Sequence, residues 1–120
     1  MSNERRTYPR HPVRVNVLVS MPDSGDSTSE FTVESINLSL TGIQLSCNGD
    51  LVAALLRQTK LPFSCTVQFS LPPHEHRFVL GSSYMSYRRK SQREFVMVVI
   101  FMHEDEQQKA LLEALLATML

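Results

Sequence analysis

The sequence contains little of what marks several large classes of protein. Only two of its 120 residues are cysteines, Cys47 and Cys65, and they lack the close spacing of a metal or redox pair. Both lie in apolar, strand-like stretches, so we expect buried or half-buried free thiols in a reducing compartment, rather than a disulfide or a metal pair. No apolar run approaches the roughly 18 residues of a membrane span. The polar, arginine-rich N-terminus has no apolar signal core, so we expect a cytoplasmic protein.

An excess of charge of one sign is also missing. Twelve Lys and Arg residues balance twelve Asp and Glu residues, for a formal net charge of +0. General binders of duplex DNA or of membrane surfaces usually carry a basic excess, which counts against both functions. Aromatic residues make up 8% of the chain, which is few for a barrel that binds single-stranded nucleic acid by stacking its bases on aromatic side chains. A local basic site on a neutral body better fits a small anionic ligand.

Catalytic signatures are absent as well. The chain has no GxSxG elbow, Walker loop, HExxH motif or glycine-rich dinucleotide fingerprint. The aspartates lie in turn-like segments, where turn formation explains them (Asp23, Asp26 and Asp50). The stretch His74-Glu75-His76 has two histidines on one strand face, but without further ligands nearby a solvated turn is the better interpretation. We therefore expect no enzymatic activity, no cofactor and no metal site.

What the chain does contain is strand periodicity. Its length suits one domain covering 1–120, and 42% of its residues are apolar. Apolar residues alternate with polar ones in most of the stretches that read as strands, and turn residues punctuate them. This pattern predicts a mainly β fold: an antiparallel sheet in meander-like order, rolled into a barrel or sandwich. The expected strands are 11–21, 30–36, 43–47, 63–71, 77–87 and 94–102, with a short helical turn or packed loop at 51–57.

The end of the chain predicts a cover for this sheet. The stretch 94–102 (EFVMVVIFM) is apolar on both faces, so both faces must be covered. Residues 105–119 read as a helix, with acidic residues at its start and a wide leucine stripe at helical spacing. We expect this helix to cover one side of the last strand. Because the stripe is broader than one contact needs, pairing with a second copy of the chain remains an alternative.

The densest positive charge lies near the start. Arg5, Arg6 and Arg10 fall within six residues, and Pro9 and Pro12 argue against a helix there. Arginine is always charged, presents a planar fork of donors to phosphate and can stack on a base. The segment 1–12 is therefore predicted to be a flexible, irregular clamp for an anion.

A second polar group follows at Asn37-x-Ser39-x-x-Gly42. In extended backbone Asn37 and Ser39 would face the same way. Asn37 can donate to and accept from a base edge, and Ser39 can serve a phosphate or a backbone group. Gly42 permits a close backbone approach or a positive φ. Alone, this hexapeptide indicates only a turn, which residues 37–42 are expected to form.

Together, Arg5-Arg6-x-x-x-Arg10 and Asn37-x-Ser39-x-x-Gly42 resemble the two-part signature of the PilZ domain family, RRxxxR followed by (D/N)xSxxG. The resemblance implies a six-stranded antiparallel β-barrel over 13–102 with a C-terminal helix over 104–120. It also implies binding of the bacterial second messenger cyclic di-GMP. By the same resemblance, the arginine segment would close over the nucleotide and grip its phosphates and guanines, while the second motif would present polar groups from the barrel surface. The implied ligand-binding residues are Arg5, Arg6, Arg10, Asn37, Ser39 and Gly42.

The resemblance further implies a receptor that signals through a changed protein-interaction surface, in motility, biofilm or exopolysaccharide control. The protein partner is not identifiable from the sequence. Relatives often place a stacking aromatic near the end of the fifth strand, and here Tyr87 or Tyr84 takes that position. Two alternatives stay open: an adaptor of type IV pilus assembly that binds no nucleotide, and a single-stranded nucleic-acid binder using the basic loop 88–93.

Overall fold

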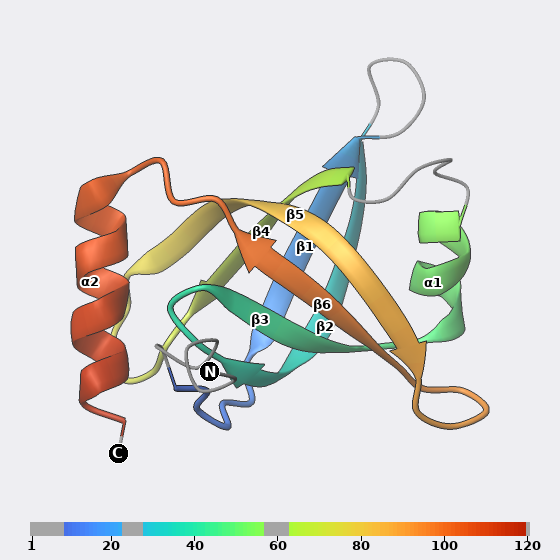
Figure 1. The fold of residues 1–120 in the computed structure, drawn as a ribbon, viewed down its shortest axis with the longest axis horizontal. Coiled ribbons are helices and arrows are strands. Elements are labelled where there is room, and N and C mark those ends of the chain that lie inside the picture. Colours follow the sequence, from blue (N-terminus) through green and yellow to red (C-terminus); the bar gives the residue numbers. More distant parts are fainter. Residues whose placement is uncertain (1–8, 23–27, 57–62, 120) are drawn as a thin grey trace, which may run out of the picture.

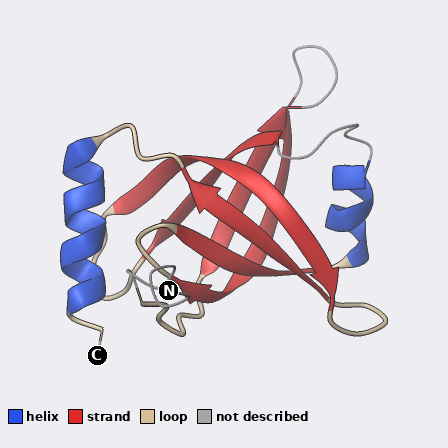
Figure 2. Ribbon diagram, viewed as in Figure 1, coloured by secondary structure: helices blue, strands red, loops and turns tan. Residues whose placement is uncertain are grey.

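The computed structural model describes residues 9–22, 28–56 and 63–119 and shows a six-stranded barrel with two helices (Figures 1 and 2). The mainly β fold with a late helix, expected from the alternating pattern and the family resemblance, is thereby confirmed. The strands are β1 (Asn16–Pro22), β2 (Thr28–Leu38), β3 (Gly42–Cys47), β4 (Phe63–Ser70), β5 (Arg77–Arg89) and β6 (Phe95–Phe101). The helices are α1 (Gly49–Leu56) and α2 (Glu106–Ala117).

The strand order differs from a simple meander. Neighbours around the closed barrel run β1-β2-β3-β6-β5-β4, and every pair is antiparallel. Two three-stranded units, β1–β3 and β4–β6, are connected in the chain through α1 and joined by the β3–β6 and β1–β4 pairs (Figure 1). Closure leaves no open sheet edge, which is the physical advantage of this order over an open meander.

The core fills the barrel with the inward half of each alternating pattern. Phe69 stacks on Phe78 and Phe101, with ring centroids 5.5 and 6.2 Å apart. On β3 the alternation is complete, with Ile43, Leu45 and Cys47 buried. Burying side chains of this size contributes roughly 1.5–3 kcal/mol each, which explains why the period-two signal located the strands.

Most element boundaries lie one or two residues from the sequence-based expectation, and the start of the first strand differs more. The first strand begins at Asn16 rather than at residue 11, because residues 11–15 are held to β2 by a bridge at His11 and by bonds with Ser35 instead of a continuous ladder. The helical alternative expected at 51–57 holds for its described residues, and the helix begins earlier, at Gly49. Gly49 and Asp50 open that helix, and Val52 N donates to Asn48 O at 3.3 Å.

Helix α2 begins as its sequence predicts. Asp105 caps it, accepting from the backbone N–H groups of Gln107 and Gln108. Its buried leucines, Leu112, Leu115 and Leu116, join the core cluster on the side of the barrel where β5 begins (Figure 1). Within the described residues no helix is long and apolar enough to cross a membrane.

The expectation that both faces of the last strand are covered is wrong for its outward face, whereas the leucines of α2 pack in the same cluster as the inward-facing Val99 and Phe101. On the outward face of β6 and just beyond it, Val98 is half-buried, Ile100 is 40% exposed and Met102 is 42% exposed. An apolar outer surface therefore remains on β6.

Candidate functional site

The N-terminal segment reaches the second motif through one β-bridge. His11 N donates to Leu38 O at 2.8 Å, and Leu38 N donates to His11 O at 2.9 Å. Arg10 and Pro12 flank His11 in the chain, and Asn37 and Ser39 flank Leu38, so the bridge brings these two segments side by side. Arg10 is exposed. The structure thus brings the segment that contains Arg10 beside the second motif, while Arg5 and Arg6 lie outside the described residues.

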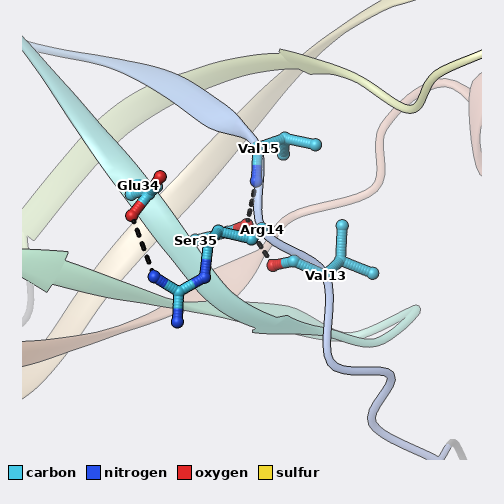
Figure 3. A network of polar contacts seen from close by, with 5 residues as sticks. All are labelled: Val13, Arg14, Val15, Glu34 and Ser35. Atoms are coloured by element: carbon cyan, nitrogen blue, oxygen red, sulfur yellow. Dashed lines mark hydrogen bonds and ion pairs between the residues drawn. The ribbon is translucent and has the colours of Figure 1, made fainter.

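A buried serine holds the segment that follows. Ser35 is 2% exposed, and its hydroxyl accepts from Val15 N at 2.9 Å while donating to Val13 O (Figure 3). Its own N–H donates to Val15 O at 2.9 Å. The Ser35 hydroxyl takes the place of a backbone hydrogen-bond partner for Val13 and Val15, because the β1–β2 ladder begins only at Asn16. Its signal in the sequence is a serine among the residues of the strand expected at 30–36.

The turn between β2 and β3 is built by Ser39. Its hydroxyl accepts from Thr41 N and Gly42 N, both at 3.2 Å, and its N–H donates to Gly42 O at 2.9 Å. The side chain is buried, with 5% exposure of the residue. The extended backbone on which Asn37 and Ser39 would share a face ends at Leu38, and the chain turns at Ser39 as the turn-like sequence predicts. The hydroxyl lone pairs are engaged within the turn.

Gly42 is explained by close packing of two strands. A Cβ at this position would lie 2.5 Å from the carbonyl oxygen of Val99 on β6. Its backbone is outside the left-handed region, so close approach rather than positive φ requires glycine. The residue lets β3 lie against β6 at the first pair of their ladder, Gly42 with Ile100.

The same turn is attached to the chain that leads into α2. Leu40 is 3% exposed and belongs to the core cluster. His103 Nε2 donates to the Leu40 carbonyl oxygen at 2.6 Å, and Phe101 N donates to Thr41 O at 2.9 Å. The other ring nitrogen of His103 is buried and has no hydrogen-bond partner among the described residues. No pattern in the sequence indicated a role for His103.

Asn37 presents its amide on the outer surface, next to a residue that the sequence analysis missed. Asn37 Nδ2 donates to Gln44 Oε1 at 3.0 Å, and both side chains are half-buried. They are opposed in the β2–β3 ladder just after its irregularity at residue 36. The bond leaves one amide oxygen and one amide nitrogen available for further contacts.

Tyr87, one of the two aromatics expected to stack on a base, is half-buried. The Tyr87 ring packs edge-on against Phe95, with centroids 6.1 Å apart, and lies against the core. The alternative, Tyr84, has a side chain outside the described part of the structure. The adjoining basic loop is partly structural, since the Arg89 guanidinium donates to Ser91 O and Gln92 O, both at 3.1 Å.

The two cysteines are buried free thiols, as expected. Burial raises the pKa of Cys47 from 9.0 to about 12 and that of Cys65 from 9.0 to about 11. Among the described residues, no group of three or more His, Cys, Asp or Glu side chains could hold a metal ion. Polar side chains near the His11–Leu38 bridge include the exposed Arg10 and the hydrogen-bonded, half-buried pair Asn37 and Gln44.

Comparison with known proteins identifies a family and similar folds. The family model described as "PilZ domain" matches residues 4–118. The fold is similar to that of the Bacillus subtilis inhibitor of motility MotI/DgrA, with a TM-score of 0.67 and 19% identity over 95% of this chain and 51% of that one. It is similar to the PilZ domain of YcgR from Escherichia coli with c-di-GMP, with a TM-score of 0.67 and 16% identity over 96% and 91%.

A third similar structure is the K. pneumonia MrkH–c-di-GMP complex, with a TM-score of 0.69 and 12% identity over 94% of this chain and 51% of that one. The chain thus spans about half the length of MotI and MrkH. No curated protein sequence matches the chain significantly. At these identities the solved structures support the fold.

Proposed function

The chain belongs to the PilZ domain family, and we propose that it is a receptor for cyclic di-GMP. The observation that supports the proposal is the His11–Leu38 bridge, which joins the segment containing Arg10 to the strand that leads into the turn of the second motif. His11 and Leu38, 27 positions apart in the chain, thereby lie side by side. Two similar structures, of YcgR and MrkH, are described as containing c-di-GMP.

The chemistry of the ligand suits this surface. Cyclic di-GMP carries two phosphates and two guanines, and an arginine fork matches both phosphate oxygens and the O6/N7 edge of guanine. Arg10 is exposed and makes no ion pair within the described residues. Asn37 adds an amide that can contact a base edge, with no charge to repel the phosphates.

The remaining motif residues receive proposed roles from this arrangement. Arg5 and Arg6, which precede Arg10 in the chain, would close over the bound nucleotide. Ser39 and Gly42 would act by shaping the turn that carries the site, because their contacts are with backbone. Closure of Arg5 and Arg6 over the nucleotide would change the surface presented around the site.

We propose that the altered surface is recognised by a protein partner, without enzymatic activity of the chain itself. The similarity to an inhibitor of motility makes control of motility the first output to examine, with biofilm and exopolysaccharide control next. The chain spans about half the length of that relative, so the partner of that relative is not assigned to this chain.

The test is calorimetric titration of the full chain with cyclic di-GMP. We expect saturable heat and an increased melting temperature. Arg10→Ala should weaken binding by roughly tenfold or more, since a charge-assisted hydrogen bond contributes about 1.5–3 kcal/mol. Arg93→Ala, an exposed arginine of the β5–β6 hairpin, is the matched control and should bind normally. Neither heat nor a thermal shift at high ligand concentration would overturn the proposal.

A further inference from the structure

An apolar ridge on the outside of the barrel borders the proposed ligand site. It consists of Val98, Ile100 and Met102, and its last two residues are 40% and 42% exposed. Its neighbours are small: Gly42 and Ser83 lie on either side of Ile100 in the ladders, and Met102 N donates to Gly81 O. Small neighbours leave the faces of Ile100 open to a flat group.

The ladder registers connect this ridge directly to the motif residues. Asn37 is opposite Gln44, and Gln44 is opposite Val98, so these three side chains form one row across the outer surface. The next row on the same face is Gly42, Ile100 and Ser83. A guanine base that rests flat on Ile100 would therefore have one edge beside the side-chain amides of Asn37 and Gln44.

The amide pair is suited to reading that edge. The hydrogen bond from Asn37 Nδ2 to Gln44 Oε1 leaves Asn37 Oδ1 as an acceptor and Gln44 Nε2 as a donor. This bond puts the free acceptor on Asn37 and the free donor on Gln44, in a fixed order. Guanine presents an O6 acceptor beside N1 and N2 donors on its edge, which matches that order, whereas adenine presents its N6 donor where guanine has O6.

We propose that Gln44 and Ile100 complete a guanine subsite, in which Ile100 is an aliphatic platform for the base and Gln44 reads its edge together with Asn37. The inference rests on the proposed function and names the residues that set its base specificity. Tyr87 does not compete for this role, because its ring packs on Phe95 and the core. An exposed isoleucine between a glycine and a serine takes the place of a stacking aromatic.

The experiment compares cyclic di-GMP with cyclic di-AMP by calorimetry on the full chain. Gln44→Leu should weaken cyclic di-GMP binding roughly tenfold and leave any cyclic di-AMP binding unchanged or stronger, so discrimination between the two falls. Gln68→Leu is the matched control, because Gln68 is a half-buried, outward glutamine on β4, away from the site. It should keep the discrimination of the unchanged chain.

The platform is tested separately. Ile100→Ala should weaken cyclic di-GMP binding by roughly fivefold through loss of apolar contact, and it should weaken cyclic di-AMP binding by a similar factor. Val79→Ala removes a comparably exposed side chain, 47% exposed on β5, and should leave both affinities unchanged. Thermal unfolding of all four variants verifies that each is folded.

The outcomes separate the two proposals. Binding of cyclic di-GMP with unaltered discrimination in folded Gln44→Leu, or unaltered affinity in folded Ile100→Ala, overturns the subsite and leaves the receptor function standing. Absence of binding by the unchanged chain overturns the receptor function and the subsite with it. Loss of discrimination in Gln44→Leu but not in Gln68→Leu, with both affinities lowered in Ile100→Ala, supports both.

Discussion

Residues around the site divide by what their polar atoms contact. Ser35 and Ser39 bond to backbone, and Gly42 makes room for a carbonyl oxygen. Asn37 and Gln44 instead keep polar atoms on the outer surface. A motif read as one set of ligand contacts thus contains residues of two kinds, and substitutions should separate their effects on stability from their effects on binding.

Gly42→Ala should lower stability by about 1–3 kcal/mol, because its Cβ meets a strand carbonyl that cannot move without disturbing the β3–β6 ladder. Urea unfolding measures this. Gly49→Ala is the control, since a Cβ at Gly49 meets nothing within 4 Å and alanine favours the helix that starts there. Equal stability of the two variants would contradict the close-approach explanation.

The buried thiols should be unreactive in the folded protein. Burial raises the pKa of Cys47 to about 12 and of Cys65 to about 11, so at pH 8 both are protonated and react slowly with iodoacetamide. Denaturant should accelerate labelling of both. Because the pKa values of both thiols in the folded protein exceed 9.0, folding favours the protonated thiols. The stability that this preference contributes is complete below pH 9 and is lost as pH rises toward 11–12. Rapid labelling of the native protein at pH 8 would refute the burial.

At the scale of elements, α2 is joined to the barrel by more than its leucines. Val79 N donates to Gln108 Oε1 at 2.9 Å, and Gln108 Nε2 donates to Val79 O at 3.2 Å. The β5–β6 ladder begins only at Ser82, so the glutamine takes the place of a strand partner. On the other side, His103 attaches the β2–β3 turn to the chain entering α2. The chain between β6 and α2 therefore contacts the turn that carries the site, through the bond from His103 to Leu40.

Gln108→Leu should lower stability by about 1 kcal/mol and accelerate hydrogen exchange of the Val79 amide roughly fivefold. The physical reason is that the Val79 N–H then has only water as its partner. Exchange measured by NMR at single amides gives the readout. Gln107→Leu, an exposed glutamine on the preceding position, serves as control. Unchanged protection of Val79 in the first variant would show that the glutamine bonds do not hold this edge.

At the scale of the whole molecule, charge is balanced overall and concentrated locally. The formal net charge is +0, so long-range attraction of an anionic ligand is weak and the arginines at the site must supply it. Cyclic di-GMP affinity should fall by roughly tenfold between low and 0.5 M salt, because salt screens exposed charges. Titrations at the two salt concentrations measure this. Arg10→Ala should show a shallower dependence, and an identical dependence would exclude Arg10 from the phosphate contacts.

The sequence alone determined the strands, the acidic start of the last helix and the family. Alternating side chains at Ile43, Leu45 and Cys47 must bury one face, and Asp105 satisfies helix N–H groups wherever the helix lies, so both signals are local. The paired motifs identified the family because residue identities alone define them. The proposed roles of Arg5 and Arg6 still rest on that signature, since both precede the described residues.

Tertiary structure decided what depends on neighbours distant in the chain. The close approach of Gly42 to Val99, the Asn37–Gln44 bond and the exposure of Ile100 follow from the registers of β3 with β2 and β6. Register is set by the closure of the barrel, which no local pattern encodes. The position of α2 likewise depends on where the core is open to its leucines. For that reason an apolar strand that sequence reasoning expected to be covered has become the proposed platform of the site.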